Sequence, residues 1–247
     1  MWLVLCSYSD TAGIWAYEGL RRLGVTPLEL VTSEALAGAR LWEHRLDAEG
    51  SHVKITLADG RVLCSGEIRG ALNRLVGPAP QALQPAAPAD REYAQAELMA
   101  FYLSWVKALP GVVINRASAL GLCGSWYQSS EWMCRAARAG LRTPSYRLSG
   151  RDALDQEFRS LAPDGAGKLS VIVLRGKVFG GRVSEGIERA CGRLADDAEA
   201  EMLGVDFFAG ADDEWTFAGA APVPDLRCGG MPLLERLKQV LTQGGNA

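Results

Sequence analysis

The first 32 residues place two apolar strands around one helix, and this order constrains the fold more than any other feature. The apolar run WLVLCS (residues 2–7) precedes DTAGIWAYEGLRRLG (10–24), in which apolar residues recur at helical spacing. Gly24 ends that helix, and VTPLELVT (25–32) has the pattern of the next strand. A strand–helix–strand unit makes its two strands parallel, so the N-terminal part is predicted to be α/β.

Turn signals and periodicity predict the remaining elements. Asp59-Gly60 separates two alternating runs within residues 52–65, which indicates a hairpin. Arg175-Gly176-Lys177 does the same within residues 169–184. Pro and Ala dominate residues 77–89, which favours an exposed loop or linker. Helices are predicted over residues 90–111, 129–140, 151–162, 186–203 and 231–245, and further strands over 68–76, 111–117, 204–210 and 214–221.

Two of these helices carry specific local predictions. Asp90 is expected to cap the start of the first, and Ser129 or Ser130 the start of the second. Gly140 is expected to end the second helix. One wide apolar face of the first helix is predicted to be core, namely Leu98, Phe101, Tyr102, Trp105 and Leu109.

Composition argues against several classes of function. The chain has 247 residues, a net charge of −3 and no basic stripe, so nucleic-acid binding is not predicted. No apolar run approaches the roughly 18 residues that a membrane span needs, so we expect no membrane association. Residues 1–10 turn polar quickly and lack a basic flank, which favours a buried strand over a signal peptide. The six cysteines form no C-x-x-C pair, which indicates buried thiols in a reducing cytoplasm and not a zinc site.

Several stretches of the second half follow the order found in one superfamily. They are VVINRA (112–117), CRAARAGLRTPSY (134–146), VIVLRGKVFGGRV (171–183), RLADDAEAEMLGVDFF (193–208) and WTFAGAAPVPDL (215–226). In this order they resemble the ATP-grasp superfamily, and within it the ligases that join a carboxylate to an amine on peptides and proteins, such as the ribosomal-protein glutamate ligase and the microviridin ligases. The resemblance implies an α/β fold with a Rossmann-like pre-ATP-grasp domain (1–112) and a reduced ATP-grasp-like α+β domain (113–247). The resemblance is also compatible with a homodimer.

The chain departs from this family where ATP and metal would bind. The resemblance implies lysines that hold the phosphates, a Gly-rich lid, and acids on two late strands that hold Mg²⁺. GSWYQSSEW (124–132) has no lysine, and the short segment between Pro144 and Val171 contains one, Lys168. Asp206 matches one metal ligand, whereas the positions expected for the others fall in residues 218–221, Ala-Gly-Ala-Ala.

These departures predict a degenerate ATP-grasp protein that does not hydrolyse ATP, with no catalytic residue, no metal and no cofactor. We expect it to bind a peptide or a partner ligase in a peptide or natural-product modification pathway, in the cytoplasm. The alternative is an active ATP-dependent carboxylate–amine ligase with an atypical site.

The loop VPDLRCGG (223–230) is one candidate for ligand binding. Arg227, beside Asp225, has the donors to clamp a carboxylate, and the amides of Gly229 and Gly230 could receive an anion. The alternative is that Asp225 caps a turn, Arg227 forms a surface ion pair, and the glycines only let the chain bend.

Two Asn-Arg pairs form the other candidate. Asn73-Arg74 and Asn115-Arg116 each stand at the end of a predicted strand, where open α/β sheets bind ligands. Both pairs could therefore face one anionic ligand. Solvated strand ends explain them equally well.

Overall fold

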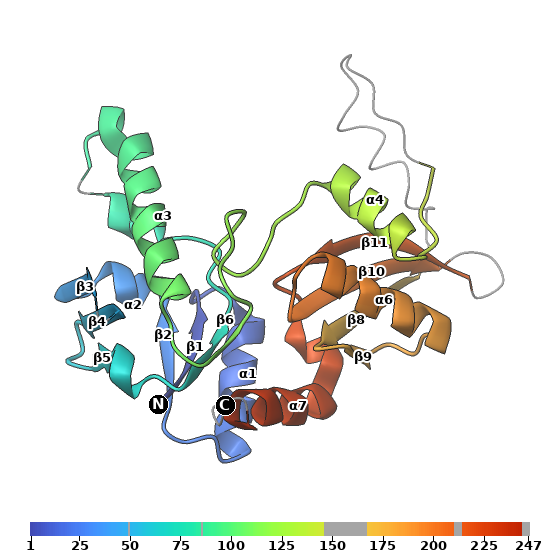
Figure 1. Ribbon diagram of the computed structural model, residues 1–247, viewed down its shortest axis with the longest axis horizontal. Coiled ribbons are helices and arrows are strands. Elements are labelled where there is room, and N and C mark those ends of the chain that lie inside the picture. Colours follow the sequence, from blue (N-terminus) through green and yellow to red (C-terminus); the bar gives the residue numbers. More distant parts are fainter. Residues whose placement is uncertain (49, 85, 146–166, 210–213, 244–247) are drawn as a thin grey trace. The chain divides into compact units, whose positions relative to one another are not determined.

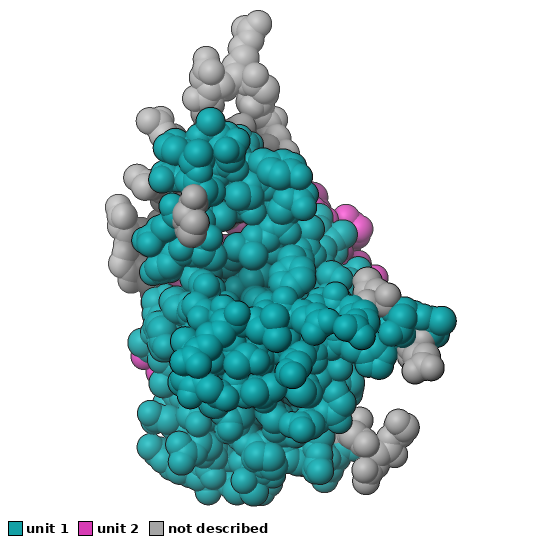
Figure 2. Space-filling model, turned by 90° about the vertical axis from the view of Figure 1, so that its left-hand side faces the viewer, with its two compact units in different colours: residues 1–125, 231–247 teal, residues 126–230 magenta. Residues whose placement is uncertain are grey.

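The computed structural model describes residues 1–48, 50–84, 86–145, 167–209 and 214–243 (Figure 1). The chain divides into two compact units, residues 1–125 with 231–247 and residues 126–230, which Figure 2 colours separately. Each unit combines helices with a β-sheet, so the predicted α/β class is confirmed at this level.

The first unit is built on a parallel sheet with the strand order β2-β1-β6-β7. Strand β1 (Trp2–Cys6) pairs in parallel with β2 (Leu28–Thr32) and with β6 (Gly70–Asn73), and β6 pairs with β7 (Val112–Ile114). Helix α1 (Thr11–Arg22) connects β1 to β2. The predicted strand–helix–strand unit is therefore confirmed.

A smaller antiparallel sheet joins β3 (Leu41–Asp47), β4 (Gly50–Thr56) and β5 (Val62–Cys64). The turn between β4 and β5 contains Gly60 with a φ of 90°, as the hairpin signal Asp59-Gly60 predicts. Three short elements precede or follow these strands along the chain: α2 (Ser33–Ala37), η1 (Ser65–Glu67) and η2 (Pro80–Leu83).

Helix α3 (Arg91–Lys107) follows the one-turn helix η3 (Pro88–Asp90) and packs its aromatic face on β3. The ring of Trp42 lies 4.8 Å from Tyr102 and 5.1 Å from Trp105, between ring centroids. Asp90 occupies the N-cap position, but its side chain makes no capping hydrogen bond. The predicted apolar face is confirmed, because all its members lie in or against the core: Leu98, Phe101, Tyr102, Trp105 and Leu109.

The last helix, α7 (Gly230–Gln243), belongs almost entirely to the first unit. It packs on α1 where Gly19 leaves room for Leu234, since a Cβ at Gly19 would meet that leucine side chain at 2.5 Å. Two hydrogen bonds add to this packing: Trp2 Nε1 donates to Leu241 O at 3.2 Å, and Lys238 Nζ donates to Leu23 O at 2.7 Å.

The second unit is an antiparallel sheet with the order β11-β10-β8-β9. Helices α4 (Ser129–Arg138) and α6 (Glu185–Asp197) pack against it and share one apolar core with it. The predicted hairpin at Arg175-Gly176 is confirmed, with φ of 46° and 75° at these residues. The strands are β8 (Lys168–Leu174), β9 (Lys177–Gly180), β10 (Met202–Ala209) and β11 (Trp215–Ala221).

Two local predictions are wrong. The N-cap of α4 is Gln128 and not Ser129 or Ser130, and its side chain makes no capping hydrogen bond. Helix α6 ends at Asp197 and does not continue to residue 203, because Met202 already pairs with β8. Strand pairing here outweighs the helical preference of the local sequence. Gly140 does end α4, and the helix predicted over residues 151–162 lies outside the described residues.

We predict that Gly111→Ala costs more stability than Gly24→Ala. Both glycines have positive φ, 70° and 85°, so each substitution costs about 1–2 kcal/mol in backbone strain. A Cβ at Gly111 would also collide with the carbonyl oxygen of Arg69, whereas nothing lies within 4 Å at Gly24. The free energy of unfolding in urea should therefore fall by about 3 kcal/mol or more for Gly111→Ala. Equal losses for the two variants would contradict this packing.

Candidate functional site

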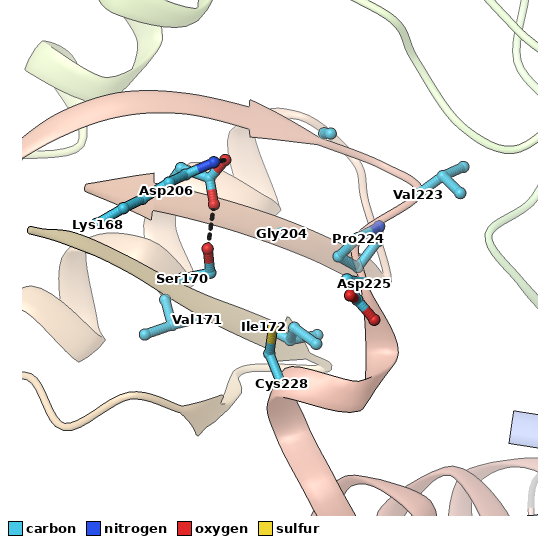
Figure 3. Close-up of a pocket in the computed structure, with 11 residues that line it drawn as sticks. Lys168, Ser170, Val171, Ile172, Gly204, Asp206, Val223, Pro224, Asp225 and Cys228 are labelled. Atoms are coloured by element: carbon cyan, nitrogen blue, oxygen red, sulfur yellow. Dashed lines mark hydrogen bonds and ion pairs between the residues drawn. The ribbon is translucent and has the colours of Figure 1, made fainter. Parts of the chain in front are cut away.

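A pocket of about 210 Å³ opens in the second unit between strands β8 and β10 and the loop after β11 (Figure 3). Aliphatic side chains and one glycine form much of its wall, and three charged side chains reach it. The lining residues are Lys168, Ser170, Val171, Ile172, Gly204, Asp206, Ala221, Val223, Pro224, Asp225 and Cys228.

Asp206 is one of the charged residues that line this pocket, and its two carboxylate oxygens have different partners. Lys168 Nζ lies 3.0 Å from Oδ2, and Ser170 Oγ donates to Oδ1 at 2.5 Å. Side chains alternate along a strand, so Lys168 and Ser170 lie on the same face of β8. The strand register sets Ser170 directly opposite Asp206 on one side and Gly219 opposite it on the other. The Asp206 carboxylate thus forms an ion pair with the Lys168 ammonium and accepts a hydrogen bond from the Ser170 hydroxyl, and both groups belong to the neighbouring strand β8.

The loop after β11 leads into the one-turn helix η5 (Leu226–Gly229) and places Asp225 and Arg227 together. The Asp225 carboxylate accepts from the backbone N–H of Arg227 at 3.1 Å. It also accepts from Nε and Nη2 of the same arginine at 2.7 and 2.6 Å. Gly229 is buried, and Gly230 has a φ of 57° where α7 begins. The capped turn and the surface ion pair are therefore both present, while ligand binding by this loop stays a prediction.

Asn73 and Asn115 come together at the end of the parallel sheet, and both are buried. Asn73 Nδ2 donates to the carbonyl oxygens of Asn115 and Leu122, at 2.8 and 2.6 Å, and Asn73 Oδ1 accepts from Leu75 N at 3.2 Å. These bonds fasten the segment after β7 to the end of β6. Asn73 thereby has a structural role, because its amide group donates to two backbone carbonyl groups in a buried region.

The two arginines of the Asn-Arg pairs have separate partners. Arg74 is buried and donates from Nε and Nη2 to the two carboxylate oxygens of Asp10, at 2.7 and 2.9 Å. Arg116 is exposed and donates to the carbonyl oxygen of Gly111 at 2.5 Å. Burial raises the pKa of the neighbouring Cys6 thiol to about 12, and the Asp10 charge adds to the rise. Ligand binding by the two pairs stays a prediction.

Sequence reasoning did not identify Asp10 as the partner of Arg74, or Lys168 and Ser170 as the partners of Asp206. One signal was available, because a Lys-x-Ser pattern at the start of a strand puts both side chains on one face. The pairing of Asp10 with Arg74 had no such signal, since these residues stand 64 positions apart.

Comparison with known proteins identifies the fold. The chain matches no protein-family model and no curated protein. It is similar to the solved structure of the macrocyclase MdnC from Microcystis aeruginosa MRC, with a TM-score of 0.72 and 11% identity over 98% of this chain and 100% of that chain. It is also similar to the ATP-grasp ligase PsnB, with a TM-score of 0.70 and 15% identity over 98% of each chain.

A third similar structure is a RiPP-associated ATP-grasp ligase from Chryseobacterium gregarium, with a TM-score of 0.66 and 9% identity over 98% of this chain and 96% of that chain. The chain therefore has the fold of the ATP-grasp peptide ligases, and the resemblance read from the sequence is confirmed.

Among the described residues, no helix is long and apolar enough to cross a membrane. Within the same residues, no three His, Cys, Asp or Glu side chains form a group that could hold a metal ion.

We predict that Asn73→Ala lowers the free energy of unfolding by about 2–4 kcal/mol, because two buried carbonyl groups lose their donor and a small cavity forms. Arg116→Ala is the matched control. Its side chain is exposed and donates to a backbone carbonyl, so its substitution should cost no more than about 0.5 kcal/mol. Urea unfolding of both variants measures the difference, and an Asn73→Ala protein as stable as Arg116→Ala would refute the structural role of Asn73.

Proposed function

We propose that this chain is an ATP-grasp-fold protein that binds a peptide or a partner ligase in a peptide-modification pathway and does not hydrolyse ATP. The observation that carries the proposal is the pairing of Asp206 with Lys168 and Ser170. Asp206 stands at the position expected for a metal ligand, and its carboxylate is already paired with an ammonium and a hydroxyl of the protein itself.

The charges of the pocket support this proposal. A triphosphate is strongly anionic, and a carboxylate near it repels it unless a cation stands between them. Among the residues that the structure describes, the carboxylates that line the pocket are Asp206 and Asp225, and the lining cation is Lys168. Lys168 is engaged with Asp206, so its charge is largely balanced before any phosphate arrives.

The described side chains that line the pocket do not fit a magnesium nucleotide. Mg²⁺ demands near-octahedral oxygen ligands and is usually held by one or two carboxylates together with substrate phosphates. Both oxygens of Asp206 already have partners, and so do both oxygens of Asp225. The residue opposite Asp206 on β11 is Gly219, which offers no side-chain oxygen. We therefore derive no step of phosphoryl transfer at this pocket.

The peptide partner is inferred from the similar proteins. MdnC is solved with a precursor peptide, and the Chryseobacterium ligase with ADP and a leader and core peptide. PsnB is solved with a precursor variant, Mg and ADP. A chain that keeps this fold and loses the nucleotide chemistry would retain peptide or ligase binding as its function.

The domain assignment is part of the same proposal. Residues 1–112 would correspond to the Rossmann-like pre-ATP-grasp domain, and residues 113–247 to a shortened ATP-grasp domain. The compact units have other bounds, since the first unit extends to residue 125 and includes residues 231–247. The parallel sheet and α1 support the first assignment, and the antiparallel sheet that carries Asp206 supports the second. Homodimer formation and a cytoplasmic location stay predictions from the sequence.

The second candidate function is an active carboxylate–amine ligase with an atypical site. One observation favours it: the side chains of Lys168 and Asp206 are 59% and 40% exposed, so water screens their ion pair. Such a pair contributes about 0–1 kcal/mol and can open readily. Lys168 could then turn toward a phosphate.

Nucleotide binding and turnover distinguish the two functions. Calorimetry with ATP and Mg²⁺ should give no binding at micromolar concentrations, and ADP release should stay at background with or without a synthetic precursor peptide. The Asp206→Asn variant keeps the shape of the side chain and should behave like the wild type in both assays. Mg²⁺-dependent ATP binding, or loss of one water from the peptide that Asp206→Asn abolishes, would establish the ligase instead.

A further inference from the structure

The carboxylate of Asp10 lies where the end of β1, the start of α1 and the end of β6 meet. It follows β1, it caps α1 by accepting from Gly13 N at 2.9 Å, and it is bound from the other side by Arg74, just after β6. Arg74 Nε and Nη2 reach the two carboxylate oxygens separately, at 2.7 and 2.9 Å. This two-bond geometry is the one in which a guanidinium recognises a planar oxyanion.

Burial distinguishes this pair from an ordinary surface ion pair. The side chain of Arg74 is 2% exposed and that of Asp10 is 15% exposed. A buried guanidinium is costly unless an anion matches it, so this arrangement needs a negative charge in order to form. The 12-residue helix α1 adds its positive N-terminal end to the same place.

Gly13 makes room for the anion. A Cβ at this position would stand 2.7 Å from Asp10 Oδ2 and 3.0 Å from Cys6 Cβ. The helix therefore approaches the carboxylate through a residue without a side chain. The Arg74 and Gly13 donors, together with the missing side chain at Gly13, therefore surround the Asp10 carboxylate closely.

We propose that the carboxyl edge of the parallel sheet holds an oxyanion site, specific for a planar carboxylate, whose occupant is the chain's own Asp10. The site is built from Arg74, Gly13 N and the start of α1. Open α/β sheets bind their ligands at this edge. In the wild type the internal carboxylate closes it, so an external carboxylate or phosphate does not enter. This inference concerns the first unit and does not rest on the proposed function.

Chemical rescue tests the proposal. In Asp10→Ala the anion is removed and its space is left open, so the Tm should fall by roughly 10 °C in chloride buffer. Formate or acetate, added at constant ionic strength, should raise the Tm of this variant with the logarithm of its concentration, since a ligand stabilises by mass action. Phosphate should act more weakly because it is not planar. The wild type should not respond to any of the three anions.

Two matched variants separate a fitted site from a general salt effect. Asp10→Asn keeps the side chain's volume and removes its charge, so its Tm should fall without any rescue by acetate. Asp225→Ala removes a carboxylate that binds Arg227 through the same two arginine atoms, but there the arginine is 53% exposed. Its Tm should change by about 2 °C or less, and acetate should not alter it.

The outcomes are decisive in either direction. If Asp10→Ala does not fold in chloride, the folded fraction at each acetate concentration replaces the Tm, and recovery supports the site. The double variant Asp10→Ala/Arg74→Met removes both charges and should be more stable than Asp10→Ala and insensitive to acetate. Failure of acetate to stabilise Asp10→Ala, or equal rescue of Asp10→Asn or Asp225→Ala, overturns the proposal.

Discussion

The bidentate ion pair between Arg74 and Asp10 is the interaction on which the first unit depends. A guanidinium that is 2% exposed must be matched by an anion, and Asp10 supplies it from the start of α1. The pair joins the ends of the neighbouring strands β1 and β6 to that helix. Next to it, Asn73 fastens the segment after β7 to the same edge. At this edge of the parallel sheet, where a ligand would be expected, Arg74 and Asn73 are thus bonded to groups of the protein itself.

In the second unit a carboxylate is also paired with groups of the protein itself, but the ion pair is exposed and contributes less to stability. Asp206 is matched by Lys168 and Ser170, but Lys168 and Asp206 are 59% and 40% exposed. An ion pair in contact with water adds about 0–1 kcal/mol, whereas breaking a buried one costs several times more. The site in the first unit is therefore closed firmly, while the pocket beside Asp206 stays open to solvent. A pocket that remains accessible and has an internally balanced charge suits binding without phosphate chemistry, which is the function proposed for this chain.

Much of the fold could be predicted from the sequence, because its signals are local. Periodicity defines α1 and the core face of α3, and Asp59-Gly60 and Arg175-Gly176 mark two hairpins. The end of α6 could not be predicted, because a tertiary strand pair at Met202 overrides a sequence that favours helix. The candidate site was predictable only in part. Asp206 was found by its order along the chain, whereas its partners, and the pairing of Asp10 with Arg74, depend on which strand ends meet in space.

We propose that internal counter-ions of this protein replace the ionic ligands that its fold would otherwise bind. Crystals soaked with Mg²⁺ and a non-hydrolysable ATP analogue test it most directly, since they report the position of Lys168 and the contents of the pocket together. We predict that Lys168 Nζ remains on Asp206 and that no nucleotide density fills the pocket. Phosphates in the pocket, with Mg²⁺ on Asp206 and Lys168 displaced from it, would contradict the claim.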